Sequence, residues 1–192
     1  MSGANASPIG RSHHEMIRCY VTDRHQGDLL ASVNAAVRDG VEIIQVREKD
    51  LGARALFELV CRIRDVAAGS RTKVLVNDRL DVALAAGVDG VHLPGHGLPT
   101  VRVRPLVKTL GRSIHTVEEG LEAERESADF VVFGPVFETP GKKPVGIEAL
   151  RAVTAVVKIP VLAIGGITHE NTPLALEAGA AGIAAIRLFQ RD

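Results

Sequence analysis

The sequence is poor in aromatic residues and has no excess of charge of either sign. Phe, Tyr and Trp make up 3% of the 192 residues, whereas apolar residues make up 46%. A core of Val, Ile, Leu and Ala is typical of helices packed on parallel strands and disfavours an all-β sandwich. Lys and Arg together number 23, as do Asp and Glu, so the net charge gives no reason to expect nucleic acid or an anionic membrane as a partner.

Cysteines and long apolar runs are also scarce. Cys19 and Cys61 have neither CxxC spacing nor a metal-ligand pattern around them, which predicts two free, buried thiols. No apolar run approaches the roughly 20 residues that span a bilayer, and residues 1–12 lack the apolar stretch of a secretory signal. We therefore expect a cytoplasmic protein. Residues 1–15 are small and polar, and we expect them to form a flexible N-terminal arm.

The length and the periodicity of the chain predict one domain. Short apolar runs alternate with stretches of helical periodicity, which is the pattern of βα units. The expected strands are 17–22, 41–46, 73–76, 90–93, 108–113, 130–134, 160–165 and 182–187, and the expected helices are 29–38, 53–67, 80–86, 99–106, 117–126, 147–156 and 171–177. This order predicts that residues 16–192 form a (β/α)₈ TIM barrel. The alternative is an open doubly wound sheet, although no GxGxxG motif opens the first unit.

The last βα unit is incomplete. Only five residues follow Arg187, which is too few for an eighth helix. The outer face of the last strand would then be open, or covered by the N-terminal arm or another subunit. Because an uncovered apolar face is an association site, we expect a barrel without its last helix and predict a homodimer.

Three polar residues occupy alternate positions at the end of the second expected strand: Gln45, Arg47 and Lys49. Residues two apart share one face of a strand, and two cations and an amide at the end of a buried strand need partners. One interpretation is that they bind an anion such as phosphate. The other is that the cations form salt bridges with Glu48, Asp50 or a neighbouring helix.

Polar residues and glycines follow the other expected strands as well. In a TIM barrel the carboxyl ends of the strands form the active site, so these residues are candidates for a single site. In chain order they are Asn77 and Asp78, His92 with the loop 94–97, Ser113 and His115, then Thr139, Gly141, Lys142 and Lys143, then Gly165 and Gly166, and last Arg187. Their shared position favours the anion-binding interpretation of the first three residues.

Several of these candidates have a second interpretation. Asp78 either caps the following helix or binds a divalent cation. Gly165 and Gly166 form either a tight turn or a cradle of free amides at a helix N-terminus that binds phosphate. Arg187 is either a surface side chain or faces the same phosphate. Lys142 lies either in an ordinary turn or in a loop that contacts phosphate.

Seven ordered segments resemble the thiamine phosphate synthase family, including its thiazole tautomerase (TenI-like) branch. They are Tyr20-Val21-Thr22-Asp23, Gln45-Val46-Arg47-Glu48-Lys49, Val76-Asn77-Asp78-Arg79, Gly90-Val91-His92-Leu93, Gly111-Arg112-Ser113-Ile114-His115, Gly134-Pro135-Val136-Phe137-Glu138-Thr139 with Lys142, and Ala163-Ile164-Gly165-Gly166-Ile167. The resemblance implies a transferase of thiamine biosynthesis. Such an enzyme joins hydroxymethylpyrimidine diphosphate to a thiazole phosphate and releases pyrophosphate, aided by magnesium.

The resemblance also implies roles for individual residues. The pyrimidine diphosphate would be held by Gln45, Arg47, Lys49, Asn77, Ser113 and Lys142. The cations in this set, Arg47, Lys49 and Lys142, would be catalytic because they stabilise the charge that builds on the leaving pyrophosphate. Asp78 would bind Mg²⁺, and Thr139 and Gly166 would contact the thiazole phosphate.

The chain departs from both branches of the family that it resembles. Synthases supply a second acidic magnesium ligand from the loop where this chain has Gly97. The tautomerase branch has a catalytic histidine where this chain has Pro135, which cannot transfer protons. Three functions are therefore alternatives: a synthase-like transferase, a tautomerase-like isomerase that uses His96 or His115, and a non-catalytic phosphate-binding or regulatory protein of the thiamine pathway.

Overall fold

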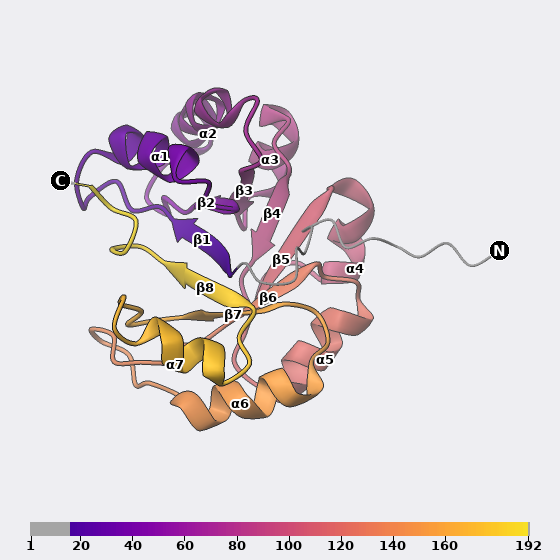
Figure 1. Cartoon of the computed structure of the whole chain (residues 1–192). Coiled ribbons are helices and arrows are strands. Elements are labelled where there is room, and N and C mark those ends of the chain that lie inside the picture. Colours follow the sequence, from indigo (N-terminus) through magenta and orange to yellow (C-terminus); the bar gives the residue numbers. More distant parts are fainter. Residues whose placement is uncertain (1–15, 192) are drawn as a thin grey trace.

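The computed structural model describes residues 16–191 and contains a closed barrel of eight parallel strands (Figure 1). The strands are β1 (Ile17–Val21), β2 (Ile43–Val46), β3 (Lys73–Asn77), β4 (Gly90–Leu93), β5 (Thr109–Ile114), β6 (Phe130–Phe133), β7 (Val161–Ile164) and β8 (Gly182–Ala185). They pair in chain order, and β8 closes the barrel against β1 with Gly182 opposite Ile17. The predicted TIM barrel is confirmed. The predicted N-terminal arm, residues 1–15, lies outside the described part.

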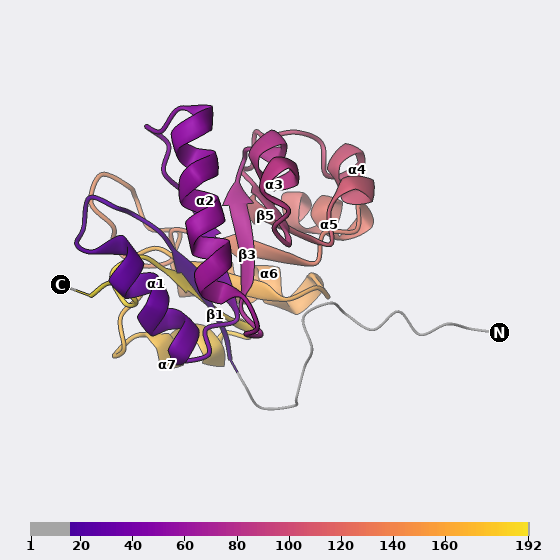
Figure 2. The ribbon, with the colours of Figure 1, turned by 90° about the horizontal axis from the view of Figure 1, so that it is seen from above.

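Helices surround this barrel. They are α1 (Leu29–Arg38), α2 (Ala53–Ala67), α3 (Leu80–Ala86), α4 (Thr100–Val103) with a 3₁₀ turn (Arg104–Leu106), α5 (Val117–Arg125), α6 (Ile147–Val156) and α7 (Thr172–Glu177). Figure 2 shows α1, α2 and α3 packed side by side. The fourth helix is shorter than the predicted 99–106, because Pro105 has no N–H for an α-helical hydrogen bond and the chain tightens into the 3₁₀ turn.

Apolar side chains fill the barrel and the layer between strands and helices. The interior cluster is Ile17, Cys19, Val21, Ile43, Leu75, Phe130, Val132, Leu162 and Ala184. Cys19 is free and buried as predicted, and burial raises its pKa to about 12. Cys61 is also free but only partly buried, so that part of the prediction is wrong.

None of the helices within residues 16–191 has the length and apolar character to cross a bilayer.

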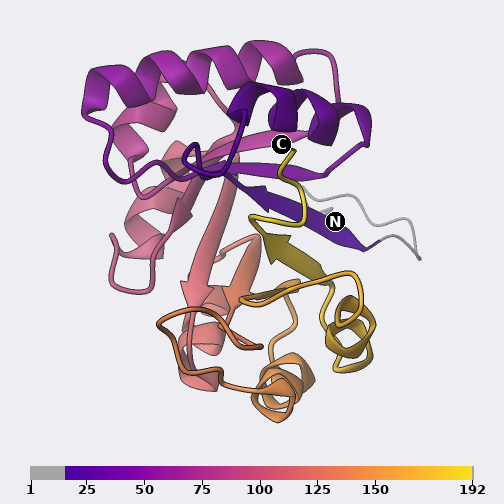
Figure 3. The same ribbon diagram turned by 90° about the vertical axis from the view of Figure 1, so that its left-hand side faces the viewer.

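Within residues 16–191 no helix follows β8, as predicted, and a turn with the residues after it takes part of the place of an eighth helix. Residues 186–191 pass from β8 toward α1 (Figures 1 and 3). The ring of Phe189 lies 5.8 Å from that of Tyr20, centroid to centroid, and the backbone N–H of Arg191 donates to Ser32 Oγ at 2.9 Å. The chain's own C-terminal segment thus covers part of the gap for which the N-terminal arm or another subunit was the predicted cover.

Candidate active site

Four polar side chains form the uppermost inward-facing layer on β2 to β5. Gln45 and Asn77 each lie two residues beyond an interior apolar residue of the same strand and therefore share its face. Gln45 Nε2 donates to Asn77 Oδ1 at 3.2 Å, and His92 Nε2 lies 2.8 Å from Ser113 Oγ. Gln45 and His92 are 4% and 2% exposed. The apolar interior thus ends in two hydrogen-bonded polar pairs.

Arg47 and Lys49 come just after this layer. Strand β2 ends at Val46, so of the three alternating residues only Gln45 lies within the strand. The acidic neighbours of the two cations are engaged elsewhere: Arg24 Nη1 lies 3.3 Å from Glu48 Oε2, and its guanidinium also pairs with Asp50. Within residues 16–191 neither Arg47 nor Lys49 forms an ion pair. The salt-bridge interpretation is therefore wrong for Glu48 and Asp50, and both cations are available to an anion.

A buried carboxylate holds the backbone at Arg47 in place. Thr22 Oγ1 donates to Glu48 Oε1 at 2.6 Å and accepts from the Arg47 backbone N–H at 3.0 Å. The Arg24 backbone N–H also donates to Glu48 at 3.2 Å. Thr22 and Arg24 were not among the predicted site residues, because nothing in the periodic pattern of the sequence links the loop after β1 to the loop after β2.

Asp78 follows β3 in a left-handed backbone conformation, with φ 65°. Its backbone N–H donates to the His92 carbonyl at 2.9 Å. The N-cap of α3 is Arg79, and no side chain caps that helix, so the capping interpretation of Asp78 is wrong. Its carboxylate forms no hydrogen bond or ion pair with any other residue of 16–191. It lines a cavity of about 260 Å³ together with Val46, Glu48, Lys49, Leu51, Leu56, Asn77 and Arg79.

The donor set for magnesium is small. No group of three or more His, Cys, Asp or Glu side chains that could hold a metal occurs within the described part of the chain. A side chain at Gly97 would place its Cβ 2.8 Å from Pro94 Cδ, so the tight loop after β4 has no room for a second acid unless it shifts. Asp78 therefore fits Mg²⁺ as a single carboxylate whose remaining ligands are waters and phosphate oxygens of a substrate.

A second candidate region lies at β6 and β7. The loop 134–146 packs on Gly165 and Gly166, whose φ angles are 94° and 64°. A Cβ at Gly165 would lie 2.4 Å from Pro135 Cβ and 3.2 Å from Thr139 Oγ1, and a Cβ at Gly166 would lie 2.3 Å from the Glu138 carbonyl. Both glycines are therefore required by conformation and by close approach. The loop contains a cavity of about 440 Å³ lined by Glu138, Thr139, Pro140, Lys142 and Pro144.

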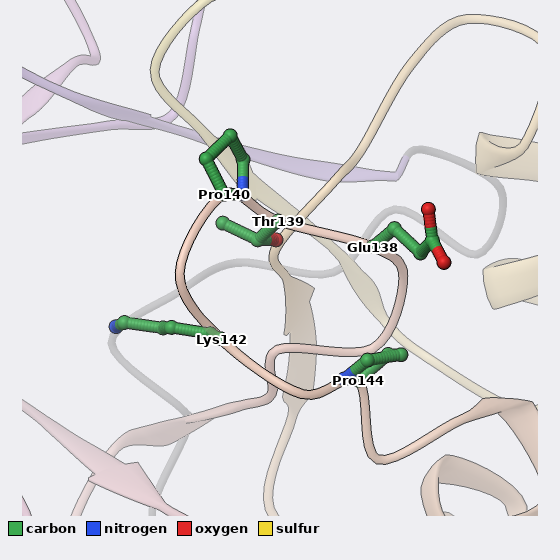
Figure 4. Close-up of a pocket in the computed structure, with 5 residues that line it drawn as sticks. All are labelled: Glu138, Thr139, Pro140, Lys142 and Pro144. Atoms are coloured by element: carbon green, nitrogen blue, oxygen red, sulfur yellow. The ribbon is translucent and has the colours of Figure 1, made fainter.

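Figure 4 shows how the side chains of this loop lie. Lys142 and Glu138 extend from it in opposite directions, with Thr139 between them. The backbones of Thr139 and Lys142 form an antiparallel bridge, with the Lys142 N–H donating to the Thr139 carbonyl at 3.0 Å. The turn thus fixes the position of the Lys142 backbone while its side chain projects away from the loop.

The glycine pair does not adjoin a helix N-terminus, so that part of the expectation is wrong. Helix α7 begins at Thr172, and Asn171 Nδ2 donates to the Gly166 carbonyl at 2.8 Å. The amides of Gly165 and Gly166 donate no hydrogen bond to another residue of 16–191. Any anion binding here would use these amides without a helix dipole directly behind them.

Arg187 is displaced from its expected place. Strand β8 ends at Ala185, and the exposed Arg187 lies in a turn two residues later, where its Nε donates to Gln26 Oε1 at 3.4 Å. It therefore extends toward the loop after β1.

His115 Nδ1 lies 3.0 Å from the Gly134 carbonyl. Because a carbonyl only accepts, Nδ1 carries the proton of this bond.

The barrel and its polar rim define a class of protein. Within residues 16–191, two cations without carboxylate partners follow β2, and an amide pair and a hydroxyl lie at the carboxyl ends of β2, β3 and β5. The loop after β6 packs on the glycine pair that follows β7. These are features of a TIM-barrel enzyme that binds phosphorylated ligands. The chain belongs to the thiamine monophosphate synthase family, whose sequence model matches residues 18–189.

Individual relatives agree with this assignment. The chain is 47% identical over 182 residues to a putative thiamine-phosphate synthase of Geobacter sulfurreducens, covering 90% of this chain and 85% of the relative. It is 38% identical over 173 residues to the thiamine-phosphate synthase of Caldanaerobacter subterraneus, covering 86% and 81%. The solved structure of thiamine phosphate pyrophosphorylase from Pyrococcus furiosus superimposes with a TM-score of 0.82 at 36% identity, covering 89% of this chain and 85% of that one. The family resemblance in the sequence is confirmed.

Proposed function

We propose that this protein is a thiamine-phosphate synthase, a transferase that joins hydroxymethylpyrimidine diphosphate to a thiazole phosphate and releases pyrophosphate. The observation that carries the proposal is the pair of cations, Arg47 and Lys49, that have no carboxylate partner in the described residues and come just after the buried Gln45, which donates to the partly buried Asn77. The names of the relatives support the transferase over the isomerase and the non-catalytic alternatives.

The first half of the rim, from β2 to β5, would hold the pyrimidine diphosphate. Arg47, Lys49 and Ser113 can donate to its phosphate oxygens, and Lys142 would approach from the loop after β6. Gln45 and Asn77 present amide groups between the cations and the barrel interior, where the pyrimidine ring can be oriented by hydrogen bonds. Because Glu48 is engaged by Thr22 and Arg24, it does not compete with the diphosphate for the cations.

The second half, at β6 and β7, would hold the thiazole phosphate. Thr139 supplies a hydroxyl, and Gly165 and Gly166 supply backbone amides. Arg187 would add a charge from the turn after β8 once its side chain leaves Gln26. Two substrates with separate phosphate groups need two anion-binding regions, and the rim offers candidates for both. Their order around one barrel mouth would place the ring nitrogen of the thiazole near the methylene carbon of the pyrimidine.

The reaction breaks the C–O bond between that methylene carbon and the diphosphate, and the electron pair leaves with pyrophosphate. The thiazole nitrogen then donates its lone pair to the carbon and forms the C–N bond. Negative charge grows on the leaving oxygens, so Arg47, Lys49 and Lys142 stabilise the transition state more than the bound substrate. Mg²⁺, held by the Asp78 carboxylate and the substrate, would neutralise part of the same charge.

The test is to incubate the full chain with both substrates, with and without Mg²⁺, and to measure thiamine phosphate. We expect magnesium-dependent product that falls strongly in Lys49→Met and is unchanged in Arg54→Met, an exposed cation on α2 that pairs with Glu58. Isomerisation of a thiazole carboxylate phosphate without thiamine phosphate would instead identify a tautomerase. Substrate binding without turnover would identify a non-catalytic protein.

We further propose that the protein is cytoplasmic and works as a homodimer. Leu174 on α7, the helix that precedes the gap left by the missing eighth helix, is 51% exposed, and a second chain could cover it. Light scattering on the purified protein would then give the mass of two chains, and Leu174→Glu would shift it toward one. A wild-type mass of one chain at micromolar concentration would contradict the dimer.

A further inference from the structure

We propose that His92 is a positioning residue that makes the Ser113 hydroxyl donate its proton to an oxygen of the diphosphate. This inference rests on the proposed function, in which Ser113 contacts the pyrimidine diphosphate. His92 itself lies below the rim, is 2% exposed, and would act on the ligand only through Ser113.

The ring of His92 is held in one place by its surroundings. In the barrel, His92 on β4 is paired with Gly111 on β5, and Ser113 lies two residues further along β5. The Phe130 ring centroid is 5.8 Å from that of His92. A Cβ at Gly111 would lie 2.6 Å from His92 Nδ1, so the glycine leaves the space that the imidazole occupies. The 2.8 Å contact between His92 Nε2 and Ser113 Oγ is the only hydrogen bond of this ring within residues 16–191.

The direction of this hydrogen bond decides what Ser113 can offer to a ligand. A serine hydroxyl has one proton and two lone pairs. Ionised phosphate oxygens can only accept, so Ser113 binds one only if its own proton points toward the phosphate. Its remaining contact, with His92, must then be accepted by Oγ. His92 Nε2 must therefore carry a hydrogen, and in the neutral imidazole Nδ1 is then the bare nitrogen.

The opposite arrangement would work against binding. If Nε2 were bare, the Ser113 proton would turn toward the imidazole, and oxygen lone pairs would face the phosphate. A buried donor of this kind orients the hydroxyl that contacts the ligand, although the donor itself does not contact the ligand. His92 thus selects the donating orientation of Ser113 without touching the substrate.

Nuclear magnetic resonance of protein labelled with ¹⁵N-histidine tests the inference directly, using inorganic pyrophosphate as the probe. The two ring nitrogens of His92, assigned by comparison with His92→Gln, report which one is protonated. We expect the Nε2–H tautomer in the presence of saturating pyrophosphate. Finding the Nδ1–H tautomer under those conditions would overturn the inference, whether or not any variant folds.

Variants provide a second test, with pyrophosphate affinity measured by calorimetry. Leucine at position 92 cannot donate to Ser113, so we expect His92→Leu to weaken binding about tenfold, the effect of one lost hydrogen bond. Glutamine can donate, and His92→Gln should stay within about threefold of the wild type. In a Ser113→Ala background, His92→Leu should cause no further loss, because both changes remove the same contact.

The outcomes separate this inference from the function on which it rests. If the wild type makes thiamine phosphate but His92→Leu binds pyrophosphate as the wild type does, the synthase stands and the positioning role is overturned. The same holds if the losses in His92→Leu and Ser113→Ala add in full. Thermal unfolding of each variant shows that its fold is intact before affinities are compared.

Discussion

Arg24 Nη1 lies 3.3 Å from Glu48 Oε2 and so joins the loop after β1 to the loop after β2. The same guanidinium pairs with Asp50, and these two carboxylates are the acidic neighbours of Arg47 and Lys49 in the chain. Arg24 is 29% exposed and Glu48 is 2% exposed by side chain, so the pair is shielded on one side. Arg24 therefore keeps two anions away from the cations of the candidate diphosphate site.

Replacing Arg24 should weaken anion binding although Arg24 has no assigned contact with the substrate. In Arg24→Met, Glu48 and Asp50 lose their cation and can pair with Arg47 or Lys49, so we expect the Kd for pyrophosphate to rise about three- to tenfold. The buried Glu48 also loses a charged partner, which should lower the free energy of unfolding by about 1–3 kcal/mol. Calorimetric titration and urea denaturation measure the two effects. Arg54→Met is the matched control, because that exposed pair with Glu58 contributes little. Equal affinity in Arg24→Met and wild type would show that the acids do not compete.

Two substitutions of Asp78 separate the effect of its charge from the effect of its backbone conformation. Its φ of 65° is tolerated by Asn and Asp but not by Ala. We expect Asp78→Asn to retain stability and to lose activity by about 10²-fold, because the proposed metal ligand is gone while the backbone is unchanged. Asp78→Ala should lose the same activity and in addition about 1–2 kcal/mol of stability. Turnover at increasing Mg²⁺ and thermal unfolding distinguish the two variants.

Asp81→Asn is the control for Asp78. Asp81 is an exposed acid on the next helix that pairs with Arg79, and Arg79 holds its pKa below the usual value. Its removal should leave turnover and magnesium dependence unchanged. Wild-type magnesium dependence in Asp78→Asn would exclude Asp78 as the ligand.

The barrel could be predicted from the sequence because each βα unit carries its own local pattern. Strand β4 (Gly90–Leu93) and helix α3 (Leu80–Ala86) have their predicted bounds in the structure. A short apolar run predicts the strand and helical periodicity predicts the helix, and both patterns can be read from neighbouring residues alone. The strand ends, with Gln45, Asn77 and Ser113, could also be predicted, because carboxyl ends of barrel strands converge. The family pattern added the expected ligand to these positions.

The remaining features depend on the path of the backbone in three dimensions. The contact of Arg24 with Glu48 joins two loops 24 residues apart and has no periodic signal. Asp78 combines a left-handed backbone conformation with a backbone hydrogen bond to His92 on the neighbouring strand, and no pattern in the sequence indicates either feature. The predicted last strand ended at Arg187, two residues too late, because β8 ends at Ala185 and the chain then turns toward α1.

Any side chain at Gly165 should displace the neighbouring loop, and the resulting loss of binding should affect the thiazole phosphate alone. A Cβ there would lie 2.4 Å from Pro135 Cβ, so Gly165→Ala must displace the loop that carries Thr139. We expect KM for the thiazole phosphate to rise at least tenfold while KM for the pyrimidine diphosphate changes little. Gly69→Ala is the matched control: its φ of 77° is equally unfavourable for alanine, but no atom lies within 4 Å of the new Cβ. Equal increases in both KM values would argue against a separate thiazole phosphate region.

His92 should make the stability of the fold depend on pH. Burial, together with the charge of Arg47, lowers its pKa to about 3, whereas the unfolded value is about 6.5. Between these values the unfolded chain binds one more proton than the folded chain, so the free energy of unfolding falls as the pH drops below about 6.5. At pH 5 the neutral, buried His92 should lower the free energy of unfolding by about 2 kcal/mol.

The measurement is urea denaturation of the metal-free wild type and of His92→Gln at pH 7 and pH 5. Other groups titrate in both proteins, so only the difference between their pH dependences reports on His92. The wild type should lose about 2 kcal/mol more than the variant over this interval. Parallel losses would mean that the folded protein accepts a proton on His92 as readily as the unfolded chain does. Such a result would contradict the buried, neutral imidazole beside Ser113, because a solvated ring at that position would leave the hydroxyl free to turn.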